Sequence, residues 1–268
     1  MTDWELAWLA LYAEDCFATA RSDPGADLLS PPPDPRLSPD WLIRGTLTAT
    51  DALFGPGSLR ILQQRVFYGW LLERAGEFVV AIRGTGDALE WAIDGMFMPQ
   101  SAHPLAGTVE TGFWSIYQSM QVDAEPFGRI ADIAKGPITV VGHSLGAAIA
   151  TYGSLDLALA GAQVRGRFVA SPHPGNEAFC RAFGAAVPAH VLYRNVDDVV
   201  PRVPFFFGYS DVSNVVELSA AKAAIRVDGG LPAQHHVLTY SALMDPGSLQ
   251  AFRPLPIDQK FLDCVRLA

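Results

Sequence analysis

The residues with the clearest chemical potential occupy positions 142–146, which read Gly-His-Ser-Leu-Gly. In this spacing the two glycines allow a strand to turn abruptly into a helix, because a Cβ atom at either flank would collide with neighbouring backbone. The turn leaves the hydroxyl of Ser144 at its apex, near the positive end of the helix that follows. A serine placed there is suited to attack a carbonyl carbon, since the developing negative charge is stabilised. Ser144 is therefore the candidate nucleophile.

The sequence on both sides of this serine predicts the elements that must position it. Residues 137–141 form a short apolar, β-branched run, which is typical of a strand buried on both faces of a sheet. Residues 145–159 are rich in alanine and leucine, with apolar side chains all round, and this predicts a helix packed against that sheet. A strand, a sharp turn and a buried helix in this order resemble the nucleophile turn of the α/β-hydrolases.

A serine nucleophile needs a histidine that accepts its proton and a carboxylate that orients the histidine. In the α/β-hydrolases these groups follow one another in the order serine, acid, histidine. Only His235 and His236 come after both Ser144 and the plausible acids. They lie between a loop signal at 229–232 and the run 237–240. By themselves, the residues leave open which of the two histidines is the base.

The favoured acid is Asp198. Residues 190–195 alternate like a strand, and Asp197 and Asp198 follow at its carboxyl end, where open α/β sheets build their sites. Asp228 and Asp197 are the main alternatives, and Asp211 also follows the nucleophile in the chain. Each of these carboxylates could equally be a solvated loop residue, which is the usual state of aspartate.

An oxyanion that forms on the substrate carbonyl needs two N–H donors. The α/β-hydrolase pattern takes one from the residue after the nucleophile, here Leu145, and one from a loop after an earlier strand. Residues 66–72 and 78–82 read as a hairpin, and the second run ends in Arg-Gly-Thr-Gly at 83–86. Thr85 is the candidate second donor, with an ordinary strand-ending turn as the alternative reading.

Six segments between about residues 65 and 244 together resemble the fungal-type, class 3 triacylglycerol lipase family. They are 81–85 (Ala-Ile-Arg-Gly-Thr), 90–94 (Glu-Trp-Ala-Ile-Asp), 112–113 (Gly-Phe), 142–148 (Gly-His-Ser-Leu-Gly-Ala-Ala), 171–176 (Ser-Pro-His-Pro-Gly-Asn) and 195–204 (Asn-Val-Asp-Asp-Val-Val-Pro-Arg-Val-Pro). Two positions depart from the family pattern: Glu110 stands where histidine is common, and His173-Pro174 replaces Arg-Val. Neither departure touches the candidate triad.

The resemblance implies an α/β-hydrolase fold in one domain over residues 1–268. That fold has a mostly parallel central sheet flanked by helices, with an N-terminal hairpin and a candidate lid helix. The resemblance also implies that the acid is Asp198. The family's histidine segment often reads His-x-x-x-Tyr, and His236 with Tyr240 fits this spacing, so the implied base is His236 rather than His235.

The same family position suggests where substrate would be contacted. A lid with an apolar inner face would follow the oxyanion strand, although apolar residues at helical spacing are more often core. Its face would come from Ala88, Leu89, Trp91, Ile93, Met96, Phe97 and Met98. After the acid, Phe205 and Phe206 would line an acyl pocket, with a core strand as the alternative reading. Trp91, Phe205 and Phe206 are thus the expected substrate-binding residues.

These residues describe a serine esterase or lipase that cleaves acyl esters, most naturally acylglycerols, through an acyl-enzyme intermediate. Ser144 would attack, His236 would carry the proton, and Asp198 would orient the imidazole. We expect neither a metal nor an organic cofactor. A phospholipase or acyltransferase would use the same triad, and a catalytically inert lipase-like binding module could keep the fold. These remain the alternative functions.

Composition narrows the setting of this chemistry. A net charge of -9 without a run of Lys or Arg argues against nucleic acid, so the expected partner is an ester lipid, with transient contact to a lipid interface. No stable protein partner can be inferred. The three cysteines, Cys16, Cys180 and Cys264, argue against a disulfide framework and a zinc site. The first residues lack the basic start of a secretory signal, and no run of about 18 apolar residues occurs, which predicts a soluble chain, cytoplasmic or exported without a leader.

Overall fold

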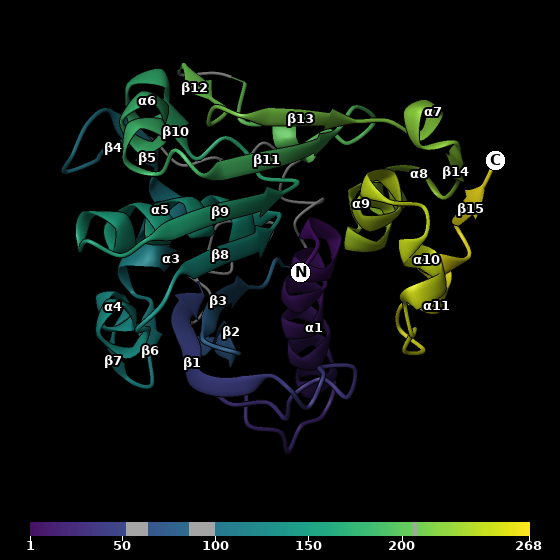
Figure 1. Ribbon diagram of the computed structural model, residues 1–268, viewed down its shortest axis with the longest axis horizontal. Coiled ribbons are helices and arrows are strands. Elements are labelled where there is room, and N and C mark those ends of the chain that lie inside the picture. The colour runs from purple at the N-terminus through teal and green to yellow at the C-terminus, as the bar shows by residue number, and fades with distance from the viewer. Residues whose placement is uncertain (52–63, 86–99, 206–207) are drawn as a thin grey trace.

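A computed structural model describes residues 1–51, 64–85, 100–205 and 208–268. Its centre is a nine-stranded sheet in the order β13-β11-β9-β8-β3-β2-β1-β6-β7 (Figure 1). The strands are β1 (Leu42–Asp51), β2 (Gln64–Arg74), β3 (Glu77–Ile82), β6 (Gln121–Val122), β7 (Glu125–Pro126), β8 (Ile138–His143), β9 (Val164–Val169), β11 (His190–Asn195) and β13 (Val215–Leu218). The neighbours from β3 to β13 pair in parallel, while β3, β2 and β1 form an antiparallel meander. The sheet is therefore mixed, with a parallel half that carries the nucleophile strand.

Smaller elements complete the described chain. The helices are α1 (Asp3–Arg21), α3 (Thr111–Gln118), α4 (Ile130–Ile133), α5 (Leu145–Leu159), α6 (Glu177–Ala186), α7 (Ala220–Ala223), α8 (Gly230–His235), α9 (Val237–Met244), α10 (Ser248–Ala251) and α11 (Gln259–Leu262), with 3-10 turns η1 (Phe127–Arg129) and η2 (Val200–Arg202). One short sheet joins β12 (Tyr209–Ser210), β10 (Gly175–Asn176), β5 (Thr108–Glu110) and β4 (Gln100–Ala102), and another joins β14 (Ile225–Val227) and β15 (Val265–Leu267). These elements surround the central sheet without extending it.

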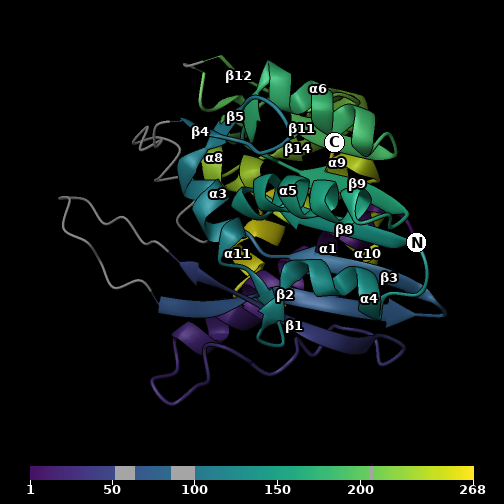
Figure 2. The same ribbon diagram turned by 90° about the vertical axis from the view of Figure 1, so that its left-hand side faces the viewer.

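Helices cover both faces of the sheet. Figures 1 and 2 show α5 and α6 on one face and α1 with α9 on the other. The expected hairpin is confirmed as β2 and β3, whose turn places Ala75 and Gly76 at positive φ. The expected strand before the nucleophile and the helix after it are confirmed as β8 and α5. The fold is thus the expected α/β-hydrolase arrangement, in which helices flank a sheet with a parallel half.

The N-terminal helix α1 is part of the core. A capping box between Thr2 and Glu5 begins it, and it packs against β2, β3, β8 and β9 and against α9. The indole nitrogen of Trp8 donates a hydrogen bond of 2.9 Å to Oγ of Ser241 in α9. No helix in the described ranges combines the length and the apolarity needed to cross a membrane. Helix α1 therefore links the sheet to the C-terminal helices, close to the end of the nucleophile strand.

A buried ionic cluster ties the start of the chain to its end. The Arg36 guanidinium donates to Asp15 of α1, to Asp34 at 2.6 Å and to Asp258 at 2.6 Å. The side chain of Arg36 is only 5% exposed, and it lies over the ring of Tyr12 at 4.6 Å from the centroid. Because three carboxylates share one cation, the cluster depends on that single side chain.

Replacement of Arg36 by leucine is therefore expected to lower the free energy of unfolding by about 3–5 kcal/mol, because it leaves buried carboxylates without their cation. Urea unfolding monitored by tryptophan fluorescence measures this change. The matched control is Arg44→Leu, which removes a 45% exposed arginine paired with Glu73 and should cost less than about 1 kcal/mol. Equal losses in the two variants would contradict the role given to the cluster.

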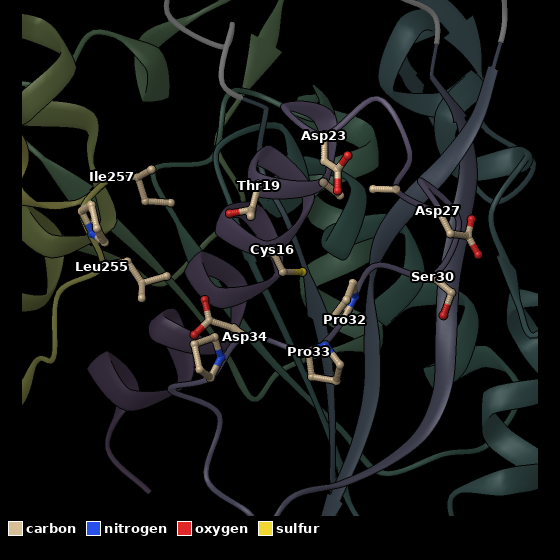
Figure 3. A pocket seen from close by; sticks show the side chains of 14 residues that line it. Cys16, Thr19, Asp23, Asp27, Ser30, Pro32, Pro33, Asp34, Leu255 and Ile257 are labelled. Atoms are coloured by element: carbon tan, nitrogen blue, oxygen red, sulfur yellow. The ribbon is translucent and has the colours of Figure 1, made fainter.

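Beside this cluster lies a cavity of about 730 Å³. Figure 3 shows its walls: the C-terminal half of α1, the proline-rich segment 30–35 and residues 255–257. Cys16 lies in the wall, and burial raises the pKa of its thiol to about 12, which leaves the thiol unreactive at neutral pH. The lining includes none of the candidate triad residues, so this cavity is separate from the site described next.

Candidate active site

The nucleophile turn holds Ser144 in a strained conformation. Ser144 joins β8 to α5 with φ 56° and ψ −129°, a backbone region that residues with a Cβ rarely adopt. Surrounding hydrogen bonds impose it: the Ser144 amide donates to the carbonyl of Val169 at 2.9 Å, and its carbonyl accepts from Ala147 at 2.9 Å. The serine is fully buried. The strain is therefore maintained by the sheet and the helix on either side, which fix where the hydroxyl points.

The two glycines of the motif are required by close backbone contacts. A Cβ placed on Gly142 would lie 2.3 Å from the carbonyl oxygen of Gly146. One placed on Gly146 would lie 2.3 Å from the carbonyl oxygen of Arg83, just beyond the end of β3. The start of α5 therefore rests directly against the loop that follows β3, as the sequence pattern predicts.

The structure brings Ser144 together with His235 and Asp198. Nε2 of His235 lies 2.9 Å from Oγ of Ser144, and Nδ1 of His235 lies 2.7 Å from Oδ2 of Asp198. All three side chains are buried. An ionised carboxylate only accepts hydrogen bonds, so Nδ1 carries the proton and the free lone pair on Nε2 faces the serine hydroxyl. This is the tautomer that can take the serine proton.

The assignment of the base to His236 is wrong. His236 is the N-cap of α9, where its Nδ1 accepts a hydrogen bond of 3.2 Å from the amide of Leu238. Its ring stacks on Phe261, with 3.9 Å between centroids and 14° between planes. His235 ends α8, and the change from helical to extended backbone between the two residues sends their side chains to different places. The His-x-x-x-Tyr spacing found the right tyrosine but the wrong histidine.

The half-buried position of His236 has a consequence for stability in acid. Burial lowers the pKa of His236 to about 3, below its ordinary 6.5. Between these two pKa values His236 is protonated in the unfolded chain but neutral in the folded chain. The free energy of unfolding therefore decreases as pH falls below about 6.5, by at most about 1.4 kcal/mol per pH unit. We expect His236→Asn, which keeps an N-cap acceptor, to flatten the fall of Tm with pH. An unchanged slope in this variant would contradict the prediction.

Asp198 is held by two donors besides the histidine. The hydroxyl of Tyr240 donates to its Oδ2 at 2.8 Å, and the amide of Val200 donates to its Oδ1 at 3.0 Å. The same tyrosine oxygen accepts from the amide of Asn195 at 3.1 Å. The other candidate acids lie elsewhere: Asp197 is exposed, Asp211 pairs with Arg194, and Asp228 pairs with Arg266. Of the acids considered, the structure brings Asp198 to the histidine.

Tyr240 is a further residue of the candidate site, through its contact with Asp198, and in the sequence it served only to locate the histidine. Tyr240→Phe removes one hydrogen bond to a buried charge and leaves the Asn195 amide without its acceptor, which should cost about 1–3 kcal/mol of stability. We expect kcat to fall roughly tenfold with little change in KM, because Asp198 is less firmly oriented. Steady-state kinetics and a melting curve measure the two effects. Full activity in the folded variant would show that Tyr240 has no part in orienting the acid.

The remaining predicted residues are placed less completely. Ile82 pairs with Gly142 in parallel, so Thr85, three residues past Ile82, follows the strand adjacent to the nucleophile strand, and Leu145 is the first residue of α5. Their roles as oxyanion donors stay predictions. Phe205 is 82% exposed, and its role in an acyl pocket also stays a prediction. The other substrate-binding candidates, Trp91 and Phe206, and the apolar set between 88 and 98 lie outside the described residues.

Two more titratable residues border the triad and were missed by the sequence analysis. Nε2 of His143 lies 2.9 Å from the carbonyl oxygen of His235, and its Nδ1 lies 3.3 Å from Oε2 of Glu14. Burial alone would raise the pKa of Glu14, but the hydrogen bond and charge of His143 lower it to about 2. Burial opposes protonation of His143, but Glu14 raises its pKa overall. Nothing in the motif signals this pair, because its members are 129 residues apart.

Comparisons with known proteins find a matching family model and related curated proteins. Residues 79–208 match the family model Lipase (class 3). Phospholipase A1-II 7 of Oryza sativa subsp. indica is 31% identical over 204 residues, which are 61% of this chain and 50% of that protein. Secreted mono- and diacylglycerol lipase A of Penicillium cyclopium is 32% identical over 140 residues, which are 50% of this chain and 46% of that protein. The chain thus spans about half the length of these curated relatives.

Solved structures show the same fold. The native Rhizomucor miehei lipase propeptide complex superposes with a TM-score of 0.58 at 21% identity, over 80% of this chain and 67% of that one. The Lip2 lipase from Yarrowia lipolytica superposes with a TM-score of 0.57 at 20% identity, over 81% of this chain and 77% of that one. At such identities the likeness concerns the fold alone. With the match of residues 79–208 to the family model, it confirms the resemblance to the class 3 lipases that was seen in the sequence.

Proposed function

We propose that this protein is a serine hydrolase of lipid esters, with Ser144 as nucleophile, His235 as general base and Asp198 as the acid that orients it. The observation that carries this proposal is the unbroken chain of contacts from Ser144 Oγ through the His235 ring to Asp198, at 2.9 and 2.7 Å. The strain at Ser144 supports it, because such backbone strain persists where it serves a site. An inert binding module would have no need of either feature.

The reaction that this geometry supports is a two-step acyl transfer. Ser144 Oγ attacks the ester carbonyl carbon as its proton passes to Nε2 of His235, and the oxyanion is held by backbone N–H groups of Leu145 and Thr85. The imidazolium then gives its proton to the leaving alcohol, which departs as the acyl-enzyme forms. Water, activated by the same histidine, releases the carboxylic acid and restores the serine.

For the substrate, we propose acyl esters of glycerol, met at a lipid interface through transient contact. The relatives named as a mono- and diacylglycerol lipase and as a phospholipase A1 support this class. The net charge of -9 favours neutral acylglycerols over anionic lipids, because an anionic surface would repel the chain. Because other relatives are named as phospholipases A1, zwitterionic phospholipid is the second candidate substrate. We also propose that residues 1–268 act as one domain, since buried apolar side chains from Leu6 to Val265 form one core cluster.

The test compares the wild-type protein with Ser144→Ala on monoacylglycerol, diacylglycerol and phosphatidylcholine emulsions, with released fatty acid titrated at constant pH. We expect release from the acylglycerols by the wild type and none by the variant. A radiolabelled alkyl fluorophosphonate provides a second readout, since Ser144 displaces its fluoride without any need for the natural acyl group. Release from phosphatidylcholine alone would favour the phospholipase. No hydrolysis and no labelling of the folded wild type would overturn the proposal.

A further inference from the structure

Helix α1 brings one carboxylate to the back of the candidate active site. Glu14 lies on the face of α1 that packs against β8, and its Oε2 faces Nδ1 of His143 at 3.3 Å. His143 immediately precedes Ser144 and is 4% exposed, while the Glu14 side chain is 22% exposed. Glu14 also precedes the part of the chain, 79–208, that matches the family model. The motif itself therefore gives no role to this contact.

The hydrogen-bond partners of His143 define its charge state. Nε2 faces the carbonyl oxygen of His235 at 2.9 Å, and a carbonyl oxygen can only accept, so Nε2 carries a proton. Nδ1 faces the Glu14 carboxylate, which when ionised also only accepts, so Nδ1 carries a proton too. A ring with acceptors on both nitrogens is an imidazolium. Glu14 and His143 thus form an ion pair one residue away from the nucleophile.

This pair touches two further parts of the catalytic apparatus. Through Nε2 it holds the backbone of His235, and the His143 and His235 rings lie 4.8 Å apart between centroids. On the other side, a Cβ built on Gly84 would lie 3.0 Å from Glu14 Oε2 and 3.1 Å from His143 Nδ1. Gly84 directly precedes Thr85, the proposed oxyanion donor. The pair therefore contacts the base, the nucleophile strand and the oxyanion loop at once.

We propose that Glu14 is a positioning residue for the proposed hydrolysis: it keeps His143 as an imidazolium, which clamps the His235 carbonyl and supports the Gly84–Thr85 loop. This inference rests on the proposed function. It makes the N-terminal helix a part of the catalytic apparatus and not only of the core. Activity should then depend on the protonation of Glu14 and His143, which would not be so for a purely structural contact.

The pH range of the clamp follows from the two partners. Glu14 has a lowered pKa of about 2, so the stabilisation that its charge gives the ion pair is complete above the ordinary value of 4.5 and is lost as pH falls toward 2. His143 has a raised pKa, so its contribution is complete below 6.5 and is lost as pH rises through that higher value. The other charged or titratable groups near the pair come from α1 itself, the β3 end, the acid loop and the α8–α9 junction: Asp15, Arg83, Asp198, His235 and His236.

The experiment uses the full chain as wild type, Glu14→Gln, and Glu177→Gln as the matched control, which removes an exposed carboxylate from α6. Proton and ¹⁵N NMR of ¹⁵N-histidine-labelled protein reports the charge of His143 across pH, and hydrolysis of a soluble p-nitrophenyl ester gives kcat and KM over the same range. In Glu14→Gln we expect His143 to deprotonate at lower pH. We also expect kcat to fall roughly tenfold at unchanged KM, and the alkaline limb of kcat to move to lower pH.

The outcomes separate this inference from the proposed function. A neutral His143 in the wild type at pH 7, or a Glu14→Gln profile that matches the Glu177→Gln profile, overturns the inference while hydrolysis still stands. A wild type that neither hydrolyses esters nor reacts with fluorophosphonate overturns the proposed function, and the NMR titration still decides whether the ion pair exists. Should Glu14→Gln fail to fold, the wild-type titration must show the loss of the His143 proton and the alkaline fall of kcat at the same pH. Different midpoints reject the inference.

Discussion

His235→Asn is expected to lower kcat about 10⁴- to 10⁶-fold on p-nitrophenyl esters, whereas His236→Asn keeps most of the wild-type activity. His235 is the residue whose Nε2 lies 2.9 Å from the serine hydroxyl, so its loss leaves Ser144 without a proton acceptor. His236 stacks on Phe261 and caps α9, and the asparagine side chain can still accept the hydrogen bond from the Leu238 amide. Burst and steady-state kinetics on both variants measure the contrast.

The paired design controls for local disruption, because both variants place the same residue at neighbouring positions of one segment. Melting curves of the two proteins identify any loss that comes from unfolding. A variant series in which His236→Asn is inactive and folded, while His235→Asn works, would reverse the assignment. It would also mean that the α8–α9 junction adopts another arrangement during turnover.

Asp198→Asn is expected to lower kcat by about 10⁴-fold while the protein stays folded. The reason lies in the donors around the carboxylate. The Val200 amide can only donate, so it selects the carbonyl oxygen of an asparagine at the Oδ1 position and turns the NH₂ group toward His235. The Tyr240 hydroxyl, which donates to Oδ2 of the aspartate, can rotate and accept from that NH₂ group. Nδ1 of His235 must then accept, its proton moves to Nε2, and the lone pair that should take the serine proton is gone. Steady-state kinetics give the loss in kcat.

The neighbouring substitution Asp197→Asn is the control for Asp198→Asn. Asp197 is exposed, one residue away and identical in type, but does not contact His235. We expect it to change kcat less than about twofold, since it removes only a solvated charge. A second check is the rate at which fluorophosphonate labels Ser144 across pH. This rate should fall in the Asp198 variant alone. Comparable losses in both variants would show that a general charge effect, rather than the tautomer of His235, controls the reaction.

The sequence alone determined the parts of this site that are local. The turn at 142–146 needs glycine at position 142 because a Cβ atom there would collide with the backbone of Gly146 within the same motif, and such a short-range constraint is part of the motif. Gly146 also belongs to the motif, although the backbone that its Cβ would meet is that of Arg83. Strand β8, helix α5 and strand β11 follow from runs of apolar or alternating residues, and Asp198 follows from its place at the end of β11. These features depend on neighbours in the chain, so their identification needed no knowledge of the tertiary structure.

The tertiary structure decided which side chains meet across long separations. His235 and His236 are equivalent in the sequence, and only the break between α8 and α9 turns one toward Ser144 and the other toward Phe261. The contact of Glu14 with His143 likewise depends on α1 packing against β8. Adjacent residues point in directions set by backbone angles at a helix junction, and a pairing over 129 residues is set by packing of the whole core. Neither the side-chain directions at the junction nor the long-range pairing can be predicted from the local sequence.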